Sequence, residues 1–302
     1  MLGTIGYPPN IEPHPSGFIT GDTAEWVFFF FCGAAVVMAA LPWAIRSAMR
    51  RDYVPSLVII SALICSLLEP MLDLLGHLHW ADDLTFLYAN FGVPIPLLIP
   101  PCYIAFLGLK SYFCYVVIRN GAKLSHFYML LVTGIVFDAT METVGINLDV
   151  FHYYGFQPYS FLGFPYWWGF VNSGSFVTIG VMLWYLVPRL KGWQQLWLLG
   201  VAPSGMMISY FGVGWVHILA HNSNLPEWVR FICATITMVM MVGYMHVLHH
   251  FAGASVGQTV PNWTLPRMFL YTLMITAAQK QRLIARLLQE SASGGLRGAR
   301  AS

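Results

Sequence analysis

Two pairs of acidic residues interrupt stretches of sequence that are otherwise apolar enough to cross a membrane. Glu69 and Asp73 are four residues apart, as are Asp138 and Glu142. Side chains with this spacing lie on one face of a helix, and His77 extends the first row by one more turn. An ionised acid near the centre of a bilayer costs at least about 2.5 kcal/mol. We therefore expect these acids to face the interior of a helix bundle.

Four acids gathered in a low-dielectric site can transfer protons. They cannot all ionise, because desolvation and mutual repulsion leave some of them protonated beside a carboxylate. A protonated acid next to a carboxylate is a general acid and a general base in one cavity. We expect Glu69 and Glu142 to form this acid–base pair. Asp73 and Asp138 would tune its protonation, and His77 would relay or orient a proton.

Other roles for the acids are compatible with the sequence. They could conduct protons or ions, or they could hydrogen-bond to neighbouring helices and only hold the bundle together. A single metal ion on Asp73, His77 and the acids at 138 and 142 is a further alternative.

The elements that must position these acids are membrane-spanning helices. Of the 302 residues, 57% are hydrophobic and 9% are charged, whereas a soluble domain is about 25% charged. A bilayer core needs about 20 apolar residues per helix, and seven such runs occur. We predict an all-α, polytopic membrane bundle with spans at about 26–45, 54–76, 94–118, 126–147, 165–187, 195–219 and 228–250.

The basic residues gather on one side of this arrangement. Thirteen of the 15 Lys and Arg residues fall in the loops after the first, third and fifth spans and in the C-terminal segment. The positive-inside rule places that side in the cytoplasm and the N-terminus outside. Both acid-bearing spans then run outward, and a rise of 1.5 Å per residue puts Glu69 roughly 22 Å and Glu142 roughly 24 Å from their inner ends. The two glutamates are therefore expected at a similar depth, in the outer half of the bilayer.

The topology divides the chain into four segments. Residues 1–25 are an extracytoplasmic segment, 26–250 the transmembrane domain, 251–290 a cytoplasmic amphipathic segment and 291–302 a disordered tail. Within the third segment, the apolar stretch 268–278 is too short to span a bilayer. We expect 265–290 to form one amphipathic helix on the membrane surface.

The loops on the outer side are long and rich in aromatic residues, in HWADDLTFLYANFGVPIP and DVFHYYGFQPYSFLGFPYWW. They could cap a cavity near the outer face, or they could form the aromatic belt found at membrane interfaces. If they cap a cavity, the candidate substrate-binding residues are Tyr153, Tyr154, Trp167, Trp168, Asn172 and His217.

Two histidine strings have the spacing of metal ligands. His217 and His221 form HxxxH, and HVLHH places further histidines at 246, 249 and 250. The topology puts the first string at the outer face and the second at the inner face, about 30 Å apart, which is too far for ligands of one metal centre. The chain also lacks a Rossmann fingerprint and a phosphate-binding loop. We expect no metal, no cofactor and no nucleic-acid partner.

Four stretches of the chain stand out together: EPMLDLLGH (69–77), GVPIP (92–96), FD and ME within 137–142, and YYGFQPYSFLGFPYWWGFVNS (153–173). In this order they resemble the spirocyclase AveC-like family, a group of bacterial integral membrane proteins, over about residues 54–250. The resemblance implies a protein of the bacterial cytoplasmic (inner) membrane, and it assigns no residue a role. The namesake of the family closes a spiroketal ring in a dihydroxy-ketone polyketide with loss of water.

Spiroketal formation needs an acid, a base and a dry pocket. Protonation of an alkene in a terpenoid cyclase needs the same groups, with aromatic rings to stabilise the cation. We therefore expect a membrane-embedded enzyme that performs cofactor-free acid–base cyclisation or dehydration of a lipophilic polyketide or terpenoid. The alternatives are a membrane terpenoid cyclase or hydratase, and a proton-coupled transporter or lipid-binding protein.

Overall fold

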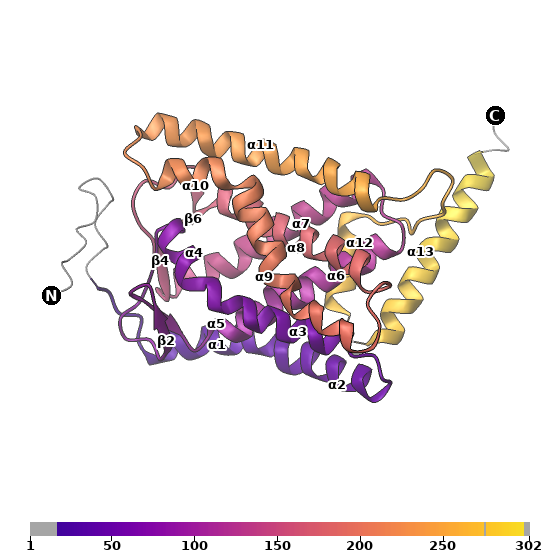
Figure 1. Cartoon of the computed structure of the whole chain (residues 1–302), viewed down its shortest axis with the longest axis horizontal. Coiled ribbons are helices and arrows are strands. Elements are labelled where there is room, and N and C mark those ends of the chain that lie inside the picture. The colour runs from indigo at the N-terminus through magenta and orange to yellow at the C-terminus, as the bar shows by residue number, and fades with distance from the viewer. Residues whose placement is uncertain (1–16, 275, 299–302) are drawn as a thin grey trace.

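The chain forms a bundle of long helices that run along the longest direction of the molecule (Figure 1). The computed structural model describes residues 17–274 and 276–298. Within them, seven helices are long and apolar enough to cross a membrane, which confirms the predicted all-α polytopic bundle. The candidate spans are Asp22–Met49, Val54–Gly76, Ile99–Arg119, Leu124–Asn147, Tyr166–Leu186, Gly192–Val213 and Glu227–Ala252.

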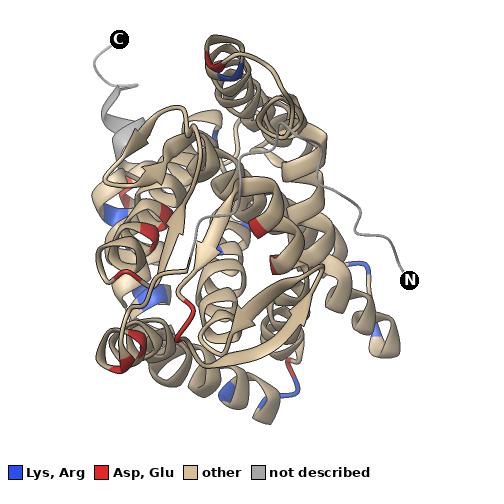
Figure 2. Cartoon of the chain, turned by 90° about the vertical axis from the view of Figure 1, so that its left-hand side faces the viewer, with Lys and Arg blue, Asp and Glu red and all other residues tan. Residues whose placement is uncertain are grey.

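The surface of the spans suits a bilayer. Charged residues are sparse, and most of the ribbon in Figure 2 belongs to other residue types. Large apolar side chains point outward instead: Phe30 is 67% exposed in the first span, and Val239 is 66% exposed in the last. Monomeric soluble proteins rarely expose continuous apolar faces of this kind, so we assign these faces to lipid contact.

Four of the seven described spans are interrupted by π-helical or 3₁₀ segments. Such segments shift the face that a helix presents, and π-helical turns often occur at functional sites. The interrupted spans are α1 (Asp22–Ala35), η1 (Val36–Ala40) and α2 (Leu41–Met49); α3 (Val54–Cys65), η2 (Ser66–Leu68) and α4 (Glu69–Gly76); α5 (Ile99–Tyr103), η3 (Ile104–Leu109) and α6 (Lys110–Arg119); and η4 (Gly192–Gly200), α9 (Val201–Met207) and η5 (Ile208–Val213).

The helix α8 (Tyr166–Leu186) is the centre of the bundle. It packs against α6, α9, α7 (Leu124–Asn147) and α11 (Glu227–Ala252). Small residues allow this close approach. A Cβ added at Gly174 would lie 2.3 Å from Met241 Sδ, and one added at Gly180 would lie 2.7 Å from Cys114 Cβ.

Short antiparallel strand pairs replace part of the predicted loops at one end of the bundle (Figure 1). The most informative pair joins β1 (Leu78–Trp80) to β4 (Phe151–Tyr153), with Trp80 opposite Phe151. This pairing connects the ends of the second and fourth spans, which carry the acids. The other pairs are β2 (Phe86–Asn90) with β3 (Val93–Pro96), and β5 (Ser160–Phe161) with β6 (Phe164–Pro165). The short helix α10 (Trp215–His221) lies at the same end.

The C-terminal segment forms two helices, where the sequence predicts one over 265–290. They are α12 (Leu265–Leu273) and α13 (Ala277–Gly298). Thr276 and Gln279 start the second helix by capping each other. The Gln279 N–H donates to Thr276 Oγ1 and the Thr276 N–H donates to Gln279 Oε1, both at 3.2 Å. This reciprocal arrangement is a capping box.

The predicted disordered tail, 291–302, is wrong over its first part. The helix α13 continues to Gly298, because extending an existing helix adds one backbone hydrogen bond per residue. Residues 299–302, like residues 1–16 of the predicted N-terminal segment, lie outside the described part of the chain. An ion pair of 2.8 Å between Arg267 and Glu290 joins α12 to α13. Figure 1 shows α13 across the end of the bundle opposite the strand pairs.

Candidate functional site

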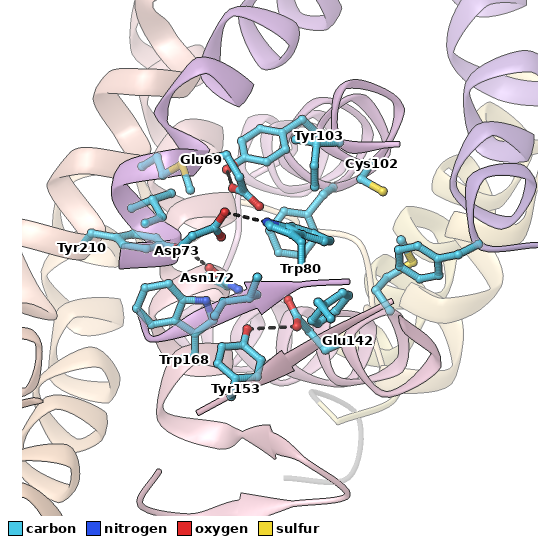
Figure 3. A pocket seen from close by; sticks show the side chains of 18 residues that line it. Glu69, Asp73, Trp80, Cys102, Tyr103, Glu142, Tyr153, Trp168, Asn172 and Tyr210 are labelled. Carbon is cyan, nitrogen blue, oxygen red and sulfur yellow. Dashed lines mark hydrogen bonds between the residues drawn. The ribbon is translucent and has the colours of Figure 1, made fainter. Parts of the chain in front are cut away.

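A cavity of about 90 Å³ lies between the spans that carry the acids (Figure 3). Three of the four predicted acids line it: Glu69 and Asp73 from α4, and Glu142 from α7. Figure 3 shows their carboxyl groups pointing into the same space. Residues that are about 70 positions apart in the sequence therefore meet in one polar site inside a membrane bundle.

The interrupted spans place several residues of this cavity. The segment η2 immediately precedes Glu69, and Pro70 lies in the first turn of α4, where its fixed φ suits the helix. Because Pro70 has no N–H, the Ser66 carbonyl four residues earlier accepts from the Tyr88 hydroxyl at 2.7 Å. The π-helical segment η3 directly follows Tyr103 and contains Phe106, and η5 contains Tyr210. The cavity is lined by Glu69, Tyr103, Phe106 and Tyr210. Three interruptions thus adjoin the same site.

Each acid that lines the cavity accepts a hydrogen bond from an uncharged donor. A tyrosine hydroxyl or an indole N–H fixes the orientation of a carboxyl group without neutralising it as a basic residue would. The pairs are Tyr103 with Glu69 Oε2, Trp80 Nε1 with Asp73 Oδ2 at 2.8 Å, and Tyr153 with Glu142 Oε2 at 3.0 Å.

Asp138 lies behind the cavity wall. Its side chain is fully buried, and Asn172 Nδ2 donates to both of its oxygens, at 3.1 Å and 3.0 Å. Asn172 in turn accepts from the Tyr210 hydroxyl through Oδ1, and both of these residues line the cavity. Asp138 is therefore linked to the cavity through Asn172.

The four acids differ in how accessible they are. Asp73 is 3% exposed and Asp138 is 0% exposed. Glu69 and Glu142, by contrast, are partly exposed, and both line the cavity. The two glutamates are thus the acids that a ligand in the cavity reaches most easily.

Positive charge is kept away from the cavity. Among the residues that the structure describes, no Lys, Arg or His lines it. Lys110, which is buried in the same bundle, donates to Thr133 Oγ1 at 3.1 Å and lies over the ring of Phe113. No ion pair in the described part of the chain joins Lys110 to an acid. The site is therefore acidic and aromatic.

His77 does not continue the acid row, contrary to the prediction. The helix α4 ends at Gly76, and His77 adopts a left-handed backbone conformation with φ of 57°. This conformation is common just after a helix, and it turns the ring away from the face of Glu69 and Asp73. The ring stacks instead on Tyr154, with centroids 5.0 Å apart.

His77 belongs to a second group of side chains, which we call the histidine cluster: His77, Tyr154, Trp167, His217 and His221. Ring centroids are 4.0 Å apart for His77 and His221, and 4.3 Å apart for Trp167 and His217. His217 is fully buried, and neither of its ring nitrogens has a hydrogen-bond partner among the described residues. None of the five residues lines the acid cavity.

The structure thus divides the predicted site residues between two places. Six of the eleven line the cavity, one lies directly behind it, and four belong to the histidine cluster. Those in the cavity are Glu69, Asp73, Glu142, Tyr153, Trp168 and Asn172; Asp138 is behind it; and His77, Tyr154, Trp167 and His217 are in the cluster.

The sequence prediction missed three donors, Trp80, Tyr103 and Tyr210. Tyrosines inside a span, near the depth of the acids, are the signal that finds Tyr103 and Tyr210. Trp80 has no such signal, because the pairing of β1 with β4 brings it back over the cavity.

The two histidine strings lie apart in the structure. The backbone N–H of His217 donates to Thr237 on α11 at 3.1 Å, and His249 comes twelve residues later on that helix, about 18 Å along its axis. The described residues contain no group of three or more His, Cys, Asp or Glu side chains arranged to hold a metal ion.

The fold and the cavity define a class: an integral membrane protein whose described residues form seven helices able to span a bilayer, with an acidic, aromatic site between them. No family model, curated protein or solved structure matches the chain. The chemistry of the site indicates the function more closely than the fold does, because one fold hosts many functions.

Proposed function

We propose that the protein is a membrane enzyme that cyclises or dehydrates a lipophilic polyketide or terpenoid by acid–base chemistry, without a cofactor, in the bacterial cytoplasmic membrane. One observation carries the proposal. Glu69 and Glu142 come from different spans, line one cavity and are both partly accessible there. A pair of acids from different spans can protonate one atom of a substrate and deprotonate another.

The reaction would use the pair in sequence. The protonated glutamic acid donates its proton to a hemiketal hydroxyl, which leaves as water and generates an oxocarbenium ion. A second hydroxyl of the same substrate attacks that carbon, and the other glutamate removes its proton. Between these steps the oxocarbenium ion is stabilised by the negative charge of the carboxylates and by the faces of the aromatic rings that line the cavity.

The remaining groups position this pair. Tyr103 and Tyr153 hold the two glutamates by one hydrogen bond each, which restricts their rotamers and aims the free oxygens. Asp73 is buried one turn after Glu69, so its charge, when present, opposes ionisation of that glutamate. The protonated and ionised forms needed for catalysis can therefore coexist in one cavity.

The size of the cavity limits what part of the substrate reacts there. A cavity of about 150 Å³ in another protein holds benzene, and this one measures about 90 Å³. It fits the reacting end of a molecule and not a complete polyketide or terpenoid. The remainder of the substrate would extend out of the cavity, and apolar residues of the bundle and the bilayer would solvate it.

The resemblance to the spirocyclase AveC-like family supports the same class of reaction, since its motifs EPMLDLLGH and FD with ME carry the four acids.

The test uses membranes that contain Glu69→Gln or Glu142→Gln. We expect each variant to insert and fold while product formation from a lipophilic extract is lost, as followed by mass spectrometry for loss of one water. Glu227→Gln, at an exposed acid outside the cavity, is the matched control. Wild-type turnover in both cavity variants would exclude this mechanism.

A further inference from the structure

The lining of the cavity is that of a cation-binding site. Three carboxyl groups, Glu69, Asp73 and Glu142, share the wall with eight Phe, Tyr and Trp residues. Carboxylates attract a positive charge directly, and the faces of aromatic rings attract it through their quadrupoles. As described above, no basic side chain among the described residues lines the cavity to satisfy these acids from within the protein.

We propose that the cavity binds a lipophilic primary ammonium ion, with its headgroup against the carboxyl groups that line it. An ammonium group has three N–H donors and no acceptor. Three acids converge on the cavity, and each already uses one oxygen for its own uncharged donor. Among the described residues, no donor reaches the second oxygen of any of these carboxyl groups, so these oxygens can accept hydrogen bonds from the ligand.

The number of N–H donors selects the headgroup. A primary ammonium at the end of an alkyl chain donates up to three N–H hydrogen bonds, whereas a trimethylammonium group has no N–H to donate. The chain of the ligand would run along apolar lining residues such as Phe28, Phe106 and Met141.

Binding of the ammonium ion follows from the lining of the cavity alone. The interpretation of the ammonium ion as a mimic of the cationic reaction intermediate rests on the proposed function. An alkylammonium ion would then act as an inhibitor, because its charge occupies the position where the oxocarbenium ion forms.

The test is calorimetric titration of the full chain in lipid nanodiscs at pH 7 with decylammonium, decyltrimethylammonium and 1-decanol, after subtraction of the heats for empty nanodiscs. We expect decylammonium to bind at least about tenfold more tightly than 1-decanol, the factor that one charged hydrogen bond supplies. We also expect it to bind more tightly than decyltrimethylammonium. Equal affinities for decylammonium and 1-decanol overturn the proposal.

Variants locate the effect. The preference for decylammonium over 1-decanol should fall severalfold in Glu69→Gln and in Glu142→Gln, should persist in Glu69→Asp, which keeps the charge, and should be unchanged in Glu227→Gln. If a glutamine variant fails to fold, the other one and Glu69→Asp carry the comparison. A preference that survives both glutamine substitutions places the cation outside the cavity and overturns the proposal.

The same variants separate this inference from the proposed function. Loss of product in the glutamine variants, with no ammonium preference in the wild type, refutes the cation site and leaves the acid–base reaction standing. An ammonium preference that depends on Glu69 and Glu142, with product formation that does not depend on them, supports the cation site and refutes the reaction.

Discussion

Trp167 and Trp168 are consecutive residues, but they belong to two different sites. Their rings meet edge to face, with centroids 4.7 Å apart and planes at 78°. Trp168 lines the acid cavity, whereas Trp167 packs against His217 of the histidine cluster at 4.3 Å. The first turn of α8 is therefore a wall between an acidic site and a group of buried imidazoles.

The separation of the two sites predicts that His217→Phe leaves product formation intact. The phenylalanine ring keeps the contact with Trp167 and removes two buried nitrogens that have no hydrogen-bond partner among the described residues. Replacing such a polar group by an apolar one of similar shape is close to neutral or stabilising. We expect a thermal midpoint equal to or above that of the wild type. A clear loss of product in a folded variant would show that the cluster takes part in the reaction.

Asn172→Leu should destabilise the protein because it breaks the link between the cavity and Asp138. The variant leaves the fully buried Asp138 without the amide that bonds both of its oxygens, and it leaves Tyr210 without its acceptor. A buried group that loses its partner costs about 1–3 kcal/mol. Thermal unfolding in detergent measures the loss.

Asn147→Leu is the matched control for this change. Asn147 is exposed at the end of the same helix as Asp138, and its side-chain amide donates to the carbonyl of Thr143 one turn before it. Its loss should change the free energy of unfolding by no more than about 0.5 kcal/mol. Similar losses in both variants would contradict a special role for the Asn172 amide.

The sequence predicts the positions of the acids better than it predicts their hydrogen-bond donors. Insertion cost and helical spacing indicate that Glu69 and Glu142 face inward at a similar depth, and they do share a cavity. The length of the apolar runs likewise predicts the seven spans. Both inferences depend on local periodicity and on the thickness of a bilayer, which act within a single helix.

The predictions that failed depend on tertiary geometry, which the periodicity of apolar and acidic residues along a helix cannot indicate. His77 keeps the four-residue spacing in the sequence, but α4 ends one residue before it. Trp80 reaches Asp73 only because β1 pairs with a strand about 70 residues later. The η3 and η5 segments, which adjoin Tyr103 and contain Tyr210, interrupt apolar runs without any change in composition.

Trp80→Phe tests whether the indole N–H is needed to hold Asp73. The substitution keeps an aromatic ring over the cavity and removes the 2.8 Å hydrogen bond to an acid that is only 3% exposed. We expect a loss of about 1–3 kcal/mol in the free energy of unfolding. Trp193→Phe, at a tryptophan that is 74% exposed, should leave stability almost unchanged. Equal stability of both variants would mean that Asp73 does not depend on this donor.

The hydrogen bonds at the start of α1 predict a pH dependence outside the membrane. The Asp83 carboxylate accepts the backbone N–H groups of Thr20 at 2.8 Å and Gly21 at 2.7 Å. The bond from Thr20 is the larger cause, and together they lower the pKa of Asp83 below its ordinary value of 3.8. A carboxyl group whose pKa is lower in the folded state stabilises the fold above its ordinary pKa, and this contribution is lost as the pH falls through the folded value.

Asp83→Asn should therefore lower the thermal midpoint at pH 7, and the difference from the wild type should shrink as the pH falls below about 3.8. Acid unfolding of the rest of the protein affects both chains, so the difference between them isolates Asp83. Glu227→Gln, at an exposed acid on the same side of the predicted topology, is the comparison variant. A difference that stays constant down to low pH would mean that the charge of Asp83 does not hold the start of α1, which carries Phe28 into the cavity wall.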